Sequence, residues 1–284
     1  MTSGFRWRSR FAVCLLLAAS AGGCAGHRAP VAGALPPAAT FSTVEASNPE
    51  LSAALLHLAL LPTAASHRRV AEAYYRAGIL DKAHDYLARA ARIDPADGWA
   101  YEGMARILRD WGAPGLGLAD AHRATYFLPR APEAHNTLGT LLFALGGVNA
   151  ARLEFEQAIA LAPGADYALS NLCYVAVSEG RSRDAVAACT RAVEASPGGT
   201  GVRNNLALAY AIDGRLDDAA REFVASGHPA GAQYNLGVLF LAVRRYEDAA
   251  TAFAAAARLD PTLPFVAQRA RQASVLAGGS DGRH

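Results

Sequence analysis

Glycine and proline recur along this 284-residue chain at a fixed interval of 34 residues. No other feature limits the possible folds as strongly, because a period of this length marks a repeat architecture. The first four glycines each precede a proline by 17 residues. The prolines are Pro95, Pro129, Pro163 and Pro197, and the glycines are Gly78, Gly112, Gly146, Gly180 and Gly214.

Each interval is expected to hold two antiparallel helices. The glycine ends the first helix, where a left-handed residue is commonly needed. The proline ends the second helix and turns the chain toward the next interval. Small residues lie between them, where two helices must approach closely, such as Gly139, Ala151 and Ala158 in the third interval. The pattern therefore predicts an all-α fold of stacked helix pairs.

These positions resemble the tetratricopeptide repeat, and residues 132–165 carry Gly139, Ala151, Phe155, Ala158 and Pro163 at its characteristic places. The resemblance implies a right-handed α-solenoid of about six tetratricopeptide helix pairs with N- and C-terminal capping helices. The pairs would occupy residues 64–97, 98–131, 132–165, 166–199, a shortened 200–229, and 230–263. Segments 49–61 and 264–277 would be the caps of a repeat domain at 48–277, followed by a disordered tail at 278–284.

The N-terminus has the three parts of an export signal over residues 1–23. Arg6, Arg8 and Arg10 precede an apolar stretch, which is too short to be a stable transmembrane helix. Small residues then lead to Cys24, which resembles a bacterial lipobox and implies that Cys24 is acylated. The alternatives are an ordinary signal cut after Ala21, giving a soluble periplasmic protein, and a retained anchor.

No aspartate follows Cys24, which resembles lipoproteins sorted to the outer membrane. We therefore expect a lipid-anchored protein on the periplasmic face of the bacterial outer membrane. Residues 24–47 would form the lipidated N-terminus and a flexible tether, because their Pro, Ala and Gly content cannot bury enough surface to fold.

Composition and motifs argue against several function classes. The net charge is +2, and −1 once the three leader arginines are removed, whereas nucleic-acid binding needs a surplus of positive charge. The eight histidines are scattered, and no phosphate-binding loop or zinc spacing occurs. His67 and His135 fall at equivalent repeat positions, which indicates that both lie in the helix seam, the contact between the two helices of a pair. We expect no catalytic residue, metal, cofactor or small-molecule substrate, and hence no enzyme.

Two cysteines remain in the predicted repeat domain. Cys173 and Cys189 occupy positions 8 and 24 of one repeat, which face each other across a helix pair. Disulfides persist in exported proteins, so a bridge is one interpretation. The other is a pair of reduced thiols in the core.

The first helices should line a concave groove with positions 2, 5, 9, 12 and 13 of each unit. In the first two units these positions carry mixed charge, at Arg68, Glu72, Arg76, Trp99, Glu102, Arg106 and Arg109. From the third unit onward they are largely apolar or aromatic, with polar residues that could bind a peptide backbone: Asn136, Phe143, Tyr167, Ser170, Tyr174, Val177, Asn204, Leu208, Ile212, Tyr234, Val238 and Leu241. We expect the C-terminal half to bind a short apolar or aromatic protein segment. Alternatively, tight curvature or the C-terminal helix buries these residues.

A lipobox joined to such an array resembles the TadD/pilotin-type lipoproteins of pilus and secretion loci. This likeness implies an assembly factor that holds a secretin or pilus component at the outer membrane. An alternative is a periplasmic adaptor that recruits a protease or cell-wall enzyme, and a third possibility is self-association.

Overall fold

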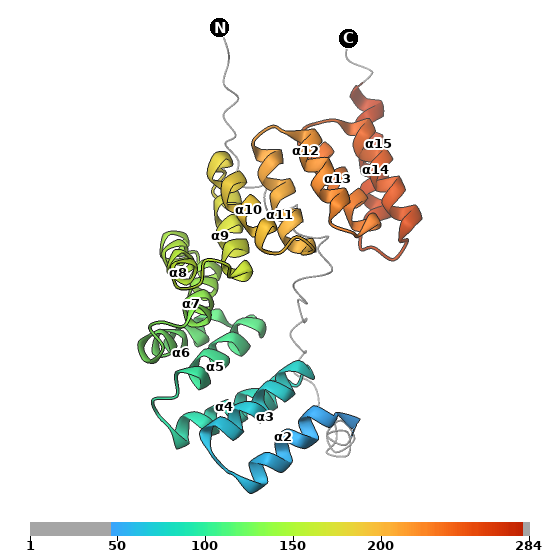
Figure 1. Ribbon diagram of the computed structural model, residues 1–284. Coiled ribbons are helices and arrows are strands. Elements are labelled where there is room, and N and C mark those ends of the chain that lie inside the picture. Colours follow the sequence, from blue (N-terminus) through green and yellow to red (C-terminus); the bar gives the residue numbers. More distant parts are fainter. Residues whose placement is uncertain (1–46, 281–284) are drawn as a thin grey trace. The chain divides into compact units, whose positions relative to one another are not determined.

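The computed structural model describes residues 47–280, which contain fourteen helices and no strand (Figure 1). The predicted signal peptide, Cys24 and all of the tether except Ser47 lie outside the described residues. The described chain divides into two compact units, residues 47–168 and 169–280, called here the N-terminal and C-terminal units. None of the described helices is both long and apolar enough to cross a membrane.

The N-terminal unit stacks a single helix and three helix pairs. The single helix is α2 (Pro49–Leu60), and the pairs are α3 (Ala64–Arg76) with α4 (Leu80–Ile93), α5 (Gly98–Asp110) with α6 (Pro114–Phe127), and α7 (Pro132–Ala144) with α8 (Val148–Leu161). Helix α9 (Asp166–Ser178) begins at its end. Leu51 of α2 is fully buried against the first pair, in one cluster with Val70 and Tyr74. The lone helix thus covers the apolar face that the first pair would otherwise expose.

The C-terminal unit continues the same pattern from residue 169. After α9 come α10 (Ser182–Ala195), α11 (Thr200–Ile212), α12 (Leu216–Ala225), α13 (Pro229–Ala242), α14 (Tyr246–Leu259) and α15 (Val266–Ser280). Helix α12 has 10 residues where α10 and α14 have 14. Helix α15 packs Val266 and Ala273 against α13 and α14. Helix α15 continues to Ser280, three residues into the segment 278–284 that the sequence assigns to the tail.

A left-handed residue ends the first helix of each pair, as the sequence predicts. The five periodic glycines have φ between 68° and 83°. At the first of them, the Ile79 amide donates to the Tyr74 carbonyl at 2.9 Å, which closes the helix end. Arg244 takes the same conformation after α13 with φ of 62°, although a side chain makes it less favourable.

Small residues let the two helices of a pair approach closely, as expected. A Cβ atom on Gly139 would lie 2.6 Å from the Phe155 ring, and one on Gly237 would lie 2.8 Å from the Phe253 ring. Both rings are buried. In these two pairs, an aromatic ring of the second helix therefore packs directly against the backbone of the first helix.

Candidate binding cleft

The N-terminal unit holds a cleft of about 1080 Å³ on the face made by the first helices of its pairs. Helix α2 contributes Glu50 and His57, α3 and α5 form most of the wall, and α7 with the start of α9 completes it. All seven charged or aromatic residues that position counting placed on this face line the cleft: Arg68, Glu72, Arg76, Trp99, Glu102, Arg106 and Arg109. The pairs are joined so that equivalent positions of successive first helices share one surface.

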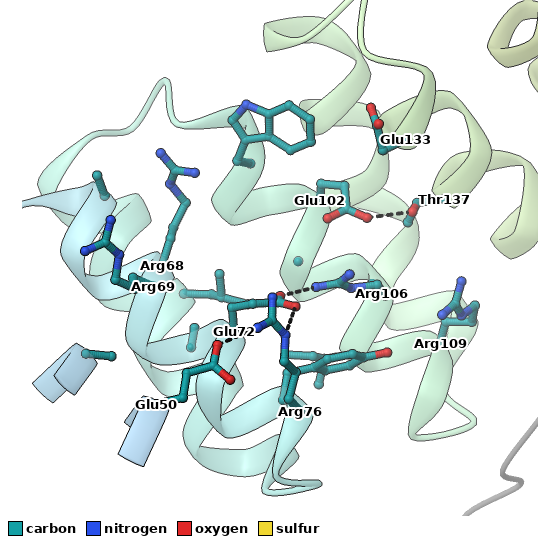
Figure 2. A pocket seen from close by; sticks show the side chains of 18 of the residues that line it. Glu50, Arg68, Arg69, Glu72, Arg76, Glu102, Arg106, Arg109, Glu133 and Thr137 are labelled. Atoms are coloured by element: carbon teal, nitrogen blue, oxygen red, sulfur yellow. Dashed lines mark hydrogen bonds and ion pairs between the residues drawn. The ribbon is translucent and has the colours of Figure 1, made fainter. Parts of the chain in front are cut away.

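Glu72 organises one part of the cleft through two arginines. Its carboxylate accepts from Arg106 at 2.8 Å and from Arg76 at 3.3 Å, and Arg76 also pairs with Glu50 (Figure 2). These side chains are partly exposed, and ion pairs of this kind contribute roughly 0–1 kcal/mol. The network therefore fixes the positions of side chains in the cleft more than it stabilises the fold.

Tyr75 links the same wall to the end of α5. Its hydroxyl donates to Asp110 at 2.5 Å, and the Arg106 guanidinium lies over its ring at 4.4 Å from the centroid. Burial, followed by the neighbouring Asp110 carboxylate, raises the pKa of Tyr75 to about 12. Tyr75 therefore stays protonated at neutral pH and acts as a hydrogen-bond donor.

Glu102 is the deeply buried charged group of this cleft, with 7% of its surface exposed. Its carboxylate accepts a hydrogen bond of 2.7 Å from the Thr137 hydroxyl on α7. Burial raises the pKa of Glu102, although Arg106, Thr137 and Arg109 each act to lower it. Sequence reasoning missed Thr137, because it stands at position 6 of its unit, which is not among the positions expected to line the groove.

The rim of the cleft carries aromatic and charged side chains that are more exposed to solvent than Glu102. Trp99 and Tyr167 are 38% and 36% exposed. The Tyr167 hydroxyl is hydrogen-bonded to Glu133, and burial together with this carboxylate raises the pKa of Tyr167. On α3, the Arg68 guanidinium lies 2.8 Å from the Asp97 carboxylate. Arg69 follows it on the same helix, is exposed, and forms no ion pair among the described residues.

The apolar groove expected in the C-terminal half is largely filled. Val177, Leu208, Tyr234 and Val238 are each 7% exposed or less, so the prediction that they form an exposed surface was wrong. Tyr234 and Val238 share a cluster with Val266 and Ala273 of α15, and Tyr234 packs edge-on against the Phe253 ring, with the ring centroids 5.4 Å apart. The C-terminal helix covers them, which was the alternative interpretation.

Val177 and Leu208 are buried for a related reason. Both lie in one cluster with alanines of α9, α10 and α11, whose small side chains let the helices approach closely. Of the other residues assigned to the groove, Tyr167 is exposed and the rest are half-buried: Asn136, Phe143, Ser170, Tyr174, Asn204, Ile212 and Leu241. Asn136 and Tyr167 line the cleft of the N-terminal unit.

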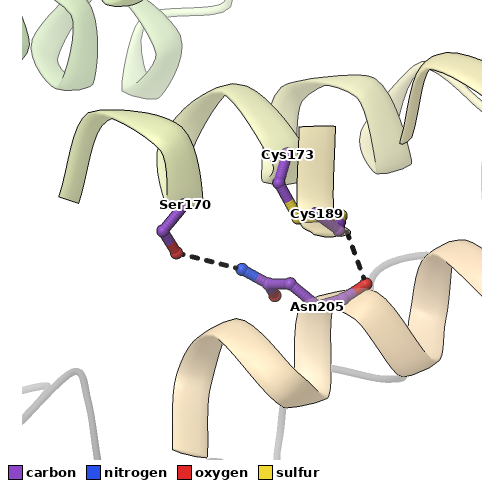
Figure 3. Close-up of a disulfide and its surroundings, with 4 residues drawn as sticks. All are labelled: Ser170, Cys173, Cys189 and Asn205. Carbon is purple, nitrogen blue, oxygen red and sulfur yellow. Dashed lines mark hydrogen bonds between the residues drawn. A yellow bond between two sulfur atoms is a disulfide. The ribbon is translucent and has the colours of Figure 1, made fainter. Parts of the chain in front are cut away.

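The structure joins Cys173 and Cys189 by a disulfide between α9 and α10, with Cα atoms 4.7 Å apart (Figure 3). Both residues are fully buried. The neighbouring Asn205 on α11 donates to the Ser170 hydroxyl at 3.5 Å. The cysteines thus fill the seam position that glycine and phenylalanine take in other pairs.

The histidines assigned to the seam lie there. His135 contacts Glu154 of α8 at 2.7 Å and the Pro129 carbonyl at 3.1 Å, and His67 lies 6.0 Å from the Tyr86 ring of α4. Within residues 47–280, no group of three or more His, Cys, Asp or Glu side chains could hold a metal ion.

Comparison with known proteins agrees with this architecture. Residues 171–227 and 224–264 match a family model described as tetratricopeptide repeat. No curated protein matches the sequence.

Three solved structures share the fold. A chain of the APC/C hetero-tetramer Cut9–Hcn1 is similar with a TM-score of 0.68 and 17% identity, over 82% of this chain and 48% of that one. PilW, described as a widely conserved type IV pilus biogenesis factor, has a TM-score of 0.65 and 19% identity over 72% of this chain and 97% of its own. The pilF protein of Pseudomonas aeruginosa has a TM-score of 0.61 and 16% identity over 75% and 96%. At these identities the likeness concerns the fold, which is all-α and of the tetratricopeptide type.

Proposed function

Tetratricopeptide repeats occupy residues 171–264 of this chain, and from that premise we propose that it is a non-catalytic scaffold that binds other proteins. The observation that carries the proposal is the cleft of about 1080 Å³ in the N-terminal unit. Arrays of helix pairs use such extended concave surfaces for binding. The cleft combines charged groups with exposed aromatic rings, which are the side chains that most often dominate interface energy.

We place this scaffold on the periplasmic face of the outer membrane, held by a lipid on Cys24. The support is the run of small residues before Cys24 and the segment rich in Pro, Ala and Gly after it. Replacing Cys24 with serine should move the protein from the membrane fraction to the soluble fraction, because the acyl chains would be lost. Membrane sedimentation of the serine variant, with an unchanged cleavage site, would contradict the anchor.

The proposed role is assembly of a pilus or secretion system. Its support is the fold shared with PilW and pilF together with the lipobox-like leader. In the alternative role, the same cleft recruits a periplasmic protease or cell-wall enzyme. The two roles differ in the identity of the protein that occupies the cleft.

Site-specific photocrosslinking in cells tests the scaffold and separates these roles. A photoreactive amino acid at Arg69, on the exposed rim, should capture a specific protein. The same residue at Tyr126 is the control, since Tyr126 is 77% exposed but does not line the cleft. A captured secretin or pilus component supports assembly, and a hydrolase supports the adaptor role. Equal labelling of the same proteins from both positions would refute the cleft as the binding surface.

A further inference from the structure

The charged side chains of the cleft are unevenly paired. Four of its five arginines have a carboxylate within 3.3 Å: Arg68, Arg76, Arg106 and Arg109. Of its four glutamates, Glu50 and Glu72 have arginine partners, whereas Glu102 and Glu133 form no ion pair within the described chain. The unmatched charge in the cleft is therefore mainly negative and lies on α5 and α7.

These two carboxylates belong to one continuous patch. Glu102 is joined to α7 by its hydrogen bond from Thr137, and Glu133 precedes Thr137 by one helical turn. Trp99 precedes Glu102 by one turn on α5, and Tyr167 is hydrogen-bonded to Glu133. Two exposed aromatic rings thus flank two carboxylates. In Figure 2 the second carboxylate oxygen of Glu102 points away from Thr137.

Glu102 shows what kind of group this patch lacks. Arg106 and Arg109 act on Glu102 from nearby, but neither forms an ion pair with it, and Thr137 supplies its one hydrogen bond from the described chain. A buried carboxylate in this position is costly, and a cation in direct contact with it offsets that cost. Aromatic faces also attract cations, with a gain of about 0.5–2 kcal/mol. An acidic ligand would have to displace a carboxylate already paired with each arginine except Arg69.

From these contacts we propose that the patch formed by Trp99, Glu102, Glu133 and Tyr167 binds a lysine or arginine side chain of the partner protein. The basic group enters between the aromatic rings and donates hydrogen bonds to the two carboxylates. This inference rests on the proposed scaffold function and specifies the chemistry of the segment that the cleft receives.

The test uses the full chain in detergent with ¹⁵N-labelled tryptophan, and three blocked heptapeptides. The peptides, of otherwise identical sequence Ala-Ser-Gly-X-Gly-Ser-Ala, carry arginine, norleucine or glutamate at X. The arginine peptide should shift the indole signal of Trp99 in a saturable way at millimolar concentration. The Trp111 signal serves as an internal control, because Trp111 does not line the cleft. The norleucine peptide should bind about tenfold more weakly or worse, which is the usual effect of losing a charge-assisted hydrogen bond.

Variants locate the effect. Glu102→Gln keeps the shape and the acceptor for Thr137, and should weaken the arginine peptide about tenfold. Glu156→Gln is the matched control, since Glu156 is exposed on α8 outside the cleft, and should change nothing. Equal binding of the arginine and norleucine peptides, an unaffected Glu102→Gln variant, or no binding of the arginine peptide would overturn the inference. The inference would also be overturned if the protein bound the glutamate peptide more tightly than the arginine peptide and the Arg69→Gln variant lost this preference.

Failure of this inference can be told from failure of the scaffold. If Arg69 still captures a specific protein in cells while the peptides show no preference for arginine, only the basic-group chemistry is wrong. If no protein is captured from the cleft, the scaffold function itself is wrong.

Discussion

Gly237 on α13 offers a sharp test of how closely the paired helices pack. A Cβ atom there would lie 2.8 Å from two atoms of the Phe253 ring and 2.9 Å from a third. Phe253 is fully buried and held on one side by Tyr234, so the ring has little room to move. Overpacking of this kind costs about 1–3 kcal/mol, and the helix-propensity gain of replacing glycine with alanine is about 0.5–1 kcal/mol. We expect Gly237→Ala to lower the free energy of unfolding by about 1–2 kcal/mol.

Gly201 provides the matched control in the same unit. It lies on α11, is exposed, and a Cβ atom there would meet nothing within 4 Å. Gly201→Ala should therefore leave stability unchanged or raise it by up to about 1 kcal/mol. Urea unfolding of both variants, followed by far-ultraviolet circular dichroism, measures the difference. If Gly237→Ala is as stable as Gly201→Ala, the close seam in α13 and α14 is refuted. A second substitution, Phe253→Leu, should recover part of the loss because it makes room for the new methyl group.

Three other predictions follow from buried groups. Tyr234→Ala should lower the free energy of unfolding in urea by about 3–5 kcal/mol, whereas Tyr126→Ala should change it by less than about 0.5 kcal/mol. A small loss for Tyr234→Ala would show that Tyr234 is a surface residue after all. Burial raises the folded-state pKa of Glu102 above its ordinary 4.5 despite Arg106 and Arg109, so its contribution to stability is present below pH 4.5 and is lost as pH rises through the raised value. Glu102→Gln should therefore gain stability relative to the wild type as pH rises from 4.5 to neutral, and a constant difference in urea midpoint would contradict this. Reduction should add two hydrogens to the intact mass through Cys173 and Cys189 and lower stability by about 3 kcal/mol for a loop of this size, and an unchanged mass would exclude the bridge.

The repeat and its helix ends could be predicted from the sequence because they depend on local residue types. A left-handed helix end needs glycine, so Gly78 and its equivalents mark it wherever they occur. A close seam needs a small residue opposite a large one, so Gly139 and Phe155 identify the facing helices. These requirements repeat with the 34-residue period and are visible without any knowledge of distant contacts.

The location of the cleft could not be predicted in the same way. Position counting identified which residues face inward, and all seven from the first two units do line the cleft. It could not tell whether another helix fills that face, because coverage depends on how α15 packs back on α13 and α14. Apolar character at Tyr234 and Val238 suggested a binding surface, whereas it reflects burial by α15. On the charged N-terminal face, Arg68, Glu72 and Arg106 stay partly exposed, with Glu72 and Arg106 paired to each other and Arg68 paired to Asp97.

The bridge between α9 and α10 also limits how far the chain can be extended. Stretching a helix pair normally releases every residue of both helices, at about 3.4 Å each. Here the 16-residue separation between Cys173 and Cys189 stays closed, so about 50 Å of contour length is withheld from any pull along the chain. A force that unravels the neighbouring pairs would therefore stop at this loop and leave it intact as a short, covalently closed hairpin.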